Sequence, residues 1–167
     1  MLRRGVGEHA GVVDGWREFD VEVARWRLGE VMVEQLPAAA AQALVDGCAS
    51  ESLGHLAAME GAGWSEIEPV LARVLDERGL HLPSEDEAMK CVADDGLGQL
   101  ATGELLFPEE TADRLRHLSM KGVNRPAWED LAVFHHLSLD WEVADDAGLD
   151  RDNLRREMVR EARELEA

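Results

Sequence analysis

The fold class is decided by residues 84–100, which read SEDEAMKCVADDGLGQL. Ser84 is followed three residues later by Glu87, the spacing of a capping box, in which the serine and glutamate side chains satisfy two backbone N–H groups at a helix start. Apolar residues then recur three and four positions apart, on one helical face: Met89, Val92, Ala93, Leu97 and Leu100. Gly96 falls on the same face, where its missing side chain lets another element approach closely. The stretch predicts an amphipathic helix packed along one side.

The same periodicity continues before and after this helix. Further helices are expected at residues 20–35, 37–47, 50–61, 69–78, 108–121, 127–137 and 152–165. Ser65 also has capping-box spacing, but Pro69 follows, so that helix begins at either Ser65 or Pro69. No run of β-branched and aromatic residues alternates between turn residues as a strand would. The sequence predicts an all-α fold, a compact bundle of about seven or eight short helices.

Composition divides the chain into two parts. Residues 1–15 carry glycine at positions 5, 7, 11 and 15 and show no amphipathic period, which predicts a flexible N-terminal lead-in. Residues 16–167 are then a single all-helical domain. Pro83 directly precedes the capping box, so residues 80–84 are a candidate hinge at which two halves of this domain meet.

The net charge restricts the classes of partner. The sequence has 35 acidic and 17 basic residues and a formal charge of −18. Binding to nucleic acids or anionic membranes depends mainly on Lys and Arg, so direct contact with either is disfavoured. The acid excess favours another protein, of basic character, as partner, although solubility alone also explains such a charge. Oligomeric state does not follow from these features.

Cysteine usage and the N-terminus indicate a location. Cys48 and Cys91 are far apart and belong to no metal-binding spacing, which is typical of reduced core residues. The N-terminus lacks the apolar stretch of a signal peptide, and no segment is long enough to cross a bilayer. These patterns predict a cytoplasmic protein.

Metal-type side chains cluster at His135, His136, Asp140 and Glu142. His136 and Asp140 would lie one turn apart on a helix, but a catalytic metal centre needs at least three protein ligands. The nearest further candidates, His117 and Glu129, share no motif with them. A structural role is therefore favoured, with His135 a packed, hydrogen-bonded imidazole beside Phe134. No catalytic, cofactor-binding or metal-binding residue is assigned, and no cofactor is expected.

One tryptophan stands apart from the expected core. Trp26 is displaced from the apolar face predicted for its helix and lies between Arg25 and Arg27. An exposed indole flanked by guanidinium groups is typical of an interface anchor.

Residues 26–37, WRLGEVMVEQLP, are followed by ALVDG at 43–47 and by the helix that begins at Ser50. Together they resemble a group of uncharacterised small acidic helical proteins of high-GC bacteria. The likeness covers residues 21–79, with a looser match over 100–118. The group has no known activity, so the resemblance implies a helical fold and no mechanism.

The leading functional hypothesis is a non-enzymatic protein-interaction module, such as an adaptor, an inhibitor or an immunity-like protein. It follows from the acid excess, the helical fold and the lack of a catalytic motif. The alternative is a helical enzyme with a metal or acid/base site near His135, His136 and Asp140.

Overall fold

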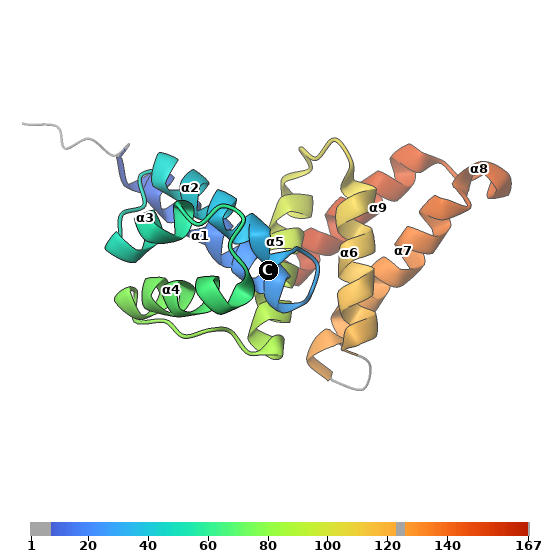
Figure 1. Cartoon of the computed structure of the whole chain (residues 1–167). Coiled ribbons are helices and arrows are strands. Elements are labelled where there is room, and N and C mark those ends of the chain that lie inside the picture. The colour runs from blue at the N-terminus through green and yellow to red at the C-terminus, as the bar shows by residue number, and fades with distance from the viewer. Residues whose placement is uncertain (1–7, 123–125, 167) are drawn as a thin grey trace, which may run out of the picture. The chain divides into compact units, whose positions relative to one another are not determined.

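The computed structural model describes residues 8–122 and 126–166 (Figure 1). No strand is present in these residues, and the all-α prediction is confirmed. The α-helices within these ranges are α1 (Glu8–Arg27), α2 (Leu36–Val45), α3 (Glu51–Ala57), α4 (Trp64–Glu77), α5 (Glu85–Thr102), α6 (Pro108–Lys121), α7 (Ala132–Glu142), α8 (Ala144–Ala147) and α9 (Arg151–Glu166). Two 3-10 helices are η1 (Val33–Gln35) and η2 (Pro126–Leu131).

The chain forms two compact units, and the boundary between them lies between residues 91 and 92, inside α5. The 80–84 segment, near which the sequence placed a meeting of two halves, belongs entirely to the first unit. It is tied there because Arg27 Nε donates a hydrogen bond to the Pro83 carbonyl at 3.1 Å.

Helix α1 is longer at its start and shorter at its end than predicted. It begins at Glu8, so the part of the expected lead-in that the structure describes is helical. Residues 1–7 of that lead-in lie outside the described residues. The helix ends at Arg27, where Gln35 was expected, because Gly29 adopts a left-handed backbone conformation with φ of 75°.

Gly15 shows why glycine spacing misled the prediction at this helix. The residue is buried, and a Cβ at this position would lie 2.7 Å from Asp46 Cβ and 3.0 Å from Cys48 Sγ. Glycine therefore lets α1 approach the segment after α2 closely. Its role here is packing, which outweighs its low helix propensity.

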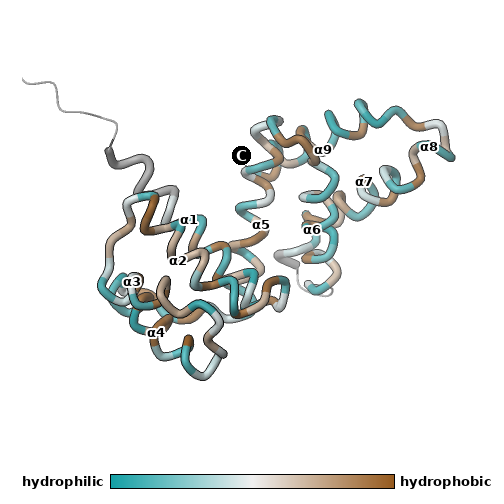
Figure 2. Tube along the Cα trace, turned by 45° about the horizontal axis from the view of Figure 1, so that its top comes forward, coloured by the Kyte–Doolittle hydropathy of each residue, from teal (hydrophilic) through white to brown (hydrophobic). Residues whose placement is uncertain are grey.

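The first unit packs α1 to α4 around one core. The buried side chains come from one face of each helix and, at Cys48, from the connector between α2 and α3: Phe19, Val23, Leu36, Ala40, Ala43, Cys48, Leu53, Leu56, Ile67, Val70, Leu71, Val74 and Leu75. Figure 2 shows apolar and polar positions alternating along the helices, as amphipathic helices require.

Serine was offered as a helix cap at positions 50, 65 and 84, and the structure agrees at 50 and 84. Ser50 Oγ accepts from Leu53 N at 3.0 Å, and Ser84 and Glu87 form the reciprocal bonds of the predicted capping box. The start of α4 was wrong at both offered positions. The helix begins at Trp64, because the Glu66 carboxylate accepts from the N–H of the preceding glycine at 3.2 Å. Pro69 lies inside the helix, which continues without the one backbone bond that proline cannot donate.

The second unit packs the rest of α5 with α6, α7 and α9. Its fully buried side chains include Leu100, Leu115, Leu118, Phe134 and Met158. Helix α8 is a single turn that ends at a left-handed glycine, and it raises the number of α-helices in the described chain above the expected seven or eight.

Gly96 lies on the buried face of α5, as its spacing predicted. A Cβ there would meet Leu115 Cδ2 at 3.2 Å and Thr111 Cγ2 at 3.4 Å. We expect Gly96→Ala to be neutral or destabilising by up to about 1 kcal/mol, because crowding offsets the gain in helix propensity. Gly96→Leu is expected to cost more, since its branches have no room. Denaturant melts in which both variants exceed the wild type would contradict this packing.

The Ser52–Glu77 contact makes the first unit sensitive to acid. Ser52 Oγ donates to Glu77 Oε1 at 2.5 Å, and this bond, with further hydrogen bonds, lowers the pKa of the Glu77 carboxyl below its ordinary value. A lowered folded-state pKa stabilises the protein above the unfolded-state pKa and is lost as the pH falls through the folded value. The Tm deficit of Ser52→Ala should therefore be largest near about pH 7 and shrink well below about pH 4.5.

The matched control for this pH dependence is Ser65→Ala. Ser65 is an exposed residue of α4 whose hydroxyl makes no hydrogen bond to a carboxylate among the described residues. Its Tm difference from the wild type should not change with pH, whereas an equal pH dependence in both variants would rule out the Glu77 bond as the cause.

Candidate functional site

The residues that the sequence offered as a metal centre do not converge. His135 is half-buried and His136 is exposed, and their ring centroids lie 5.7 Å apart in an edge-to-face arrangement. Asp140 is exposed one turn beyond His136. Over residues 8–122 and 126–166, no three His, Cys, Asp or Glu side chains are grouped as metal ligands would be.

The neighbouring candidates take part in local packing. Glu142 Oε1 pairs with Arg116 Nη2 at 3.6 Å, and His117 Nδ1 lies 2.8 Å from the carbonyl oxygen of Asp113. Glu129 is exposed in η2. His135 differs from expectation in one respect, because its buried Nδ1 makes no hydrogen bond within the described part of the chain. These contacts are local and bring no further ligand to His136 and Asp140.

Trp26 was predicted to be an exposed anchor, and that prediction is wrong. Its ring stacks on the ring of Trp64 at a centroid distance of 4.3 Å and an interplanar angle of 26°. Both indoles are half-buried against the core of the first unit. The indole of Trp26 therefore joins the start of α4 to the end of α1 and leaves little surface for a partner.

A small hollow of about 190 Å³ in the first unit holds reactive side-chain types. Cys91 and His81 line it, together with Glu87. The Glu87 carboxylate accepts from the N–H and the hydroxyl of Ser84, each at 2.8 Å, and lies 3.3 Å from His81 Nε2. The Ser84 bonds lower the pKa of Glu87. This carboxylate is therefore committed to the helix start and does not serve the Cys91 thiol.

The cysteines keep their thiols. Cys48 is buried and Cys91 is half-buried, and neither is in a disulfide. Burial raises the pKa of the Cys48 thiol, which disfavours its nucleophilic form.

Helix α9 presents two different sides. Asp150 caps its start, since Asp150 Oδ1 accepts from Asp152 N at 2.9 Å. The side formed by Leu154, Met158 and Ala162 is buried in the second unit. A second row, spaced four residues apart, contains Arg155, Val159 and Arg163 and faces a groove.

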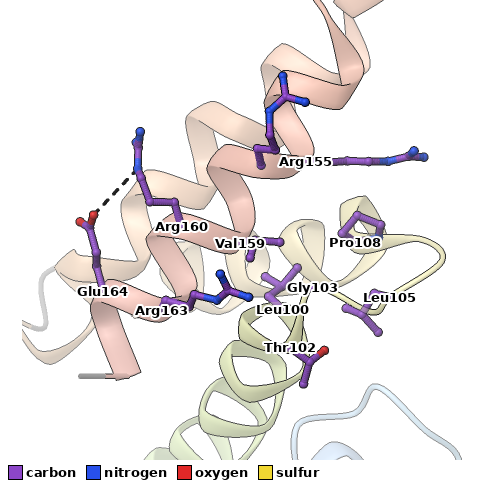
Figure 3. Close-up of a pocket in the computed structure, with 11 residues that line it drawn as sticks. Leu100, Thr102, Gly103, Leu105, Pro108, Arg155, Val159, Arg160, Arg163 and Glu164 are labelled. Atoms are coloured by element: carbon purple, nitrogen blue, oxygen red, sulfur yellow. Dashed lines mark ion pairs between the residues drawn. The ribbon is translucent and has the colours of Figure 1, made fainter.

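The opposite wall is the end of α5 and the connector that follows it. A Cβ on Gly103, which has a φ of 72°, would lie 3.6 Å from Arg163 Nη2 and 3.7 Å from Val159 Cγ1. Arg163 Nε donates to the Ala101 carbonyl at 2.8 Å. The guanidinium thus meets the carbonyl end of α5, where the helix dipole favours a cation. Figure 3 shows Arg163 extending towards Leu100 and Gly103, with Arg160 and Glu164 paired on another side of α9.

The space between these walls is called the α9 groove here. Its volume is about 650 Å³, and its lining residues are Leu100, Thr102, Gly103, Leu105, Pro108, Arg155, Arg156, Val159, Arg160, Arg163 and Glu164. The charged residues of the lining are four arginines and one glutamate, so the groove is positive although the chain has a net charge of −18. Apolar side chains lie between them. Such a lining can hold an apolar group and carboxylates together.

The sequence analysis missed this groove, since it offered no site on the helix at 152–165. The arginines at 155, 156, 160 and 163 were visible, as was the apolar connector Leu105–Phe107. Their proximity depends on tertiary packing of α9 near the end of α5, which no local pattern contains.

The described structure defines an all-α protein with an arginine-rimmed groove on its second unit. No protein-family model matches the chain, and searches of the curated proteins and of the solved structures find no match either. None of the helices in the described ranges combines the length and apolar composition needed to cross a membrane.

Proposed function

We propose that this chain is a non-enzymatic protein-interaction module, an adaptor, inhibitor or immunity-like protein, which holds its partner in the α9 groove. The observation that carries the proposal is that the groove is lined mainly by arginines in a chain of net negative charge, and that exposed apolar side chains lie next to its lining in the sequence. Leu106 and Phe107, in the connector after Leu105, are 82% and 59% exposed. Exposed apolar side chains beside a groove are typical of a surface that a partner covers.

The cysteines and the acid excess complete the proposal. Two thiols that remain unpaired with each other fit a reducing, cytoplasmic setting. The net charge of −18 disfavours nucleic acids and anionic membranes as occupants. A basic partner, which the net charge alone favoured, would meet the acidic remainder of the surface, whereas the groove itself favours the opposite sign.

A matched pair of variants tests the function. Val159→Glu places a carboxylate inside the groove, and Val45→Glu makes the same change on α2, where the valine is 78% exposed. Affinity purification from native cells should recover a protein in stoichiometric amount with the wild type and with Val45→Glu, and lose it with Val159→Glu. Recovery by all three, or by none, would count against the proposal. Circular dichroism of each variant controls for folding.

The enzyme alternative has its own measurement. Stoichiometric zinc in the purified wild type, absent from both His136→Ala and Asp140→Ala, would favour a metal enzyme over the interaction module. We expect no stoichiometric zinc and only modest stability changes, because both residues are exposed on α7.

A further inference from the structure

We propose that the occupant of the α9 groove is an acidic, amphipathic helical segment of a partner protein, with carboxylates about two turns apart and apolar side chains between them. This inference rests on the proposed function and adds the chemistry of the partner.

The charge of the groove sets the sign of its occupant. Four arginines line the groove, and a guanidinium is the planar donor fork that a carboxylate accepts in bidentate form. Arg160 is paired with Glu161 and Glu164. Arg155, Arg156 and the Nη groups of Arg163 therefore carry the positive charge offered to a ligand. The rest of the chain carries the acid excess, so a carboxylate ligand is repelled by most of the surface and attracted at this place. The arginines attract an acidic segment while the acidic surface elsewhere repels it, so the segment is directed to the groove.

The arginines can exchange their present partners. Arg155 Nη1 lies 3.7 Å from Asp152, and Arg156 Nη2 lies 3.9 Å from Asp150. The carboxylates of these two aspartates are 76% and 67% exposed, and such exposed ion pairs contribute little. The Nη groups of Arg155 and Arg156 can therefore leave these exposed pairs and donate to a ligand.

The spacing of the arginines on α9 determines the spacing of the carboxylates on the partner helix. Arg155 and Arg163 are eight residues apart on one helix, a separation of roughly 12 Å along its axis at 1.5 Å per residue. A partner helix laid along α9 would match them with carboxylates seven or eight positions apart. Val159 lies midway between the two arginines, so the partner needs an apolar residue midway between its carboxylates.

A peptide segment fits better than a small organic anion. A volume of about 650 Å³ would suffice for a small ligand, but two exposed apolar side chains, Leu106 and Phe107, stand in the chain between the lining residues Leu105 and Pro108. A ligand confined to the groove would leave these exposed side chains uncovered, whereas a helix of several turns would cover them.

The test is an unbiased selection with the full chain as bait and a helical-peptide library as probe. Enriched peptides should carry Asp or Glu seven or eight positions apart with Leu, Ile or Phe between them. Arg155→Glu and Arg156→Glu should weaken binding of an enriched peptide by at least about tenfold. Arg151→Glu is the matched control, because Arg151 lies on the same helix outside the groove and pairs with Asp145. It should change affinity by less than about threefold.

Each outcome decides a different point. Enrichment of basic or uncharged peptides, equal loss in the control variant, or no enrichment would overturn the acidic-helix assignment. Displacement of the peptide by octanoate at comparable concentration would assign the groove to small carboxylates instead. If native partner recovery still depends on Val159 in any of these cases, the interaction function stands and only the partner class fails. Loss of that dependence as well would overturn the function.

Discussion

Phe134→Ala is expected to destabilise the protein by about 3 to 5 kcal/mol, the usual cost of removing a fully buried aromatic ring. The Phe134 side chain is 0% exposed and lies on the inner side of α7. Alanine leaves a cavity that the surrounding helices fill only partly. Because whole proteins are stable by about 5 to 15 kcal/mol, such a loss is a large share of the total. Denaturant unfolding followed by circular dichroism measures it.

Phe107→Ala is the matched control for this cavity. The chemical change is the same, but Phe107 is 59% exposed before α6, so the loss should stay within about 0.5 kcal/mol. Similar losses in the two variants would show that Phe134 is not enclosed as described. Phe107→Ala should nevertheless weaken partner binding if the connector belongs to the docking surface.

The parts of the fold that the sequence predicted are those that local chemistry determines. The Ser84 capping box and the apolar periodicity behind it predicted α5, and both are confirmed. Gly96 was likewise assigned correctly to the packed face. In each case the deciding contacts lie within one helix, or follow from which face of it is apolar.

The errors occur where tertiary contacts outweigh local propensity. Glycines at 11 and 15 predicted a flexible segment, but Gly15 is required for the close approach of α1 to Asp46. Pro69 led to a predicted start at either Ser65 or Pro69, although α4 begins at Trp64 and tolerates one missing backbone bond at this proline. Trp26 was placed outside the core because its partner, Trp64, is 38 residues away in sequence.

The α9 groove could not be predicted from the sequence, because it also depends on tertiary contacts. Net charge describes the whole chain, and it favoured a basic partner. The α9 groove reverses that sign locally, because four arginines of one helix line it and one of them, Arg163, meets the carbonyl end of α5. Only the packing of α9 near Gly103 brings these groups to one place. The sign of a partner is therefore better inferred from a local surface than from composition.

Gly122 gives the sharpest test of packing in the second unit. It follows the last residue of α6, but its φ is −83°, a value that any residue adopts, so the helix end does not require glycine. The requirement for glycine comes from Trp128 instead. A Cβ at position 122 would lie 2.5 Å from Trp128 Cγ and 2.7 Å from Trp128 Cβ. The crowded atoms lie near the backbone of Trp128, so the indole cannot relieve the contact by a small rotation of its far end.

Gly122→Ala is therefore expected to destabilise the protein by about 1 to 3 kcal/mol through overpacking. The matched control is Gly54→Ala in the middle of α3, where a Cβ would meet nothing within 4 Å. That variant should gain about 0.5 to 1 kcal/mol from helix propensity, so the two substitutions differ in sign. A double-mutant cycle isolates the cause: in a Trp128→Ala background, Gly122→Ala should lose most of its cost. An unchanged cost in that background would mean that Trp128 does not set the requirement for glycine.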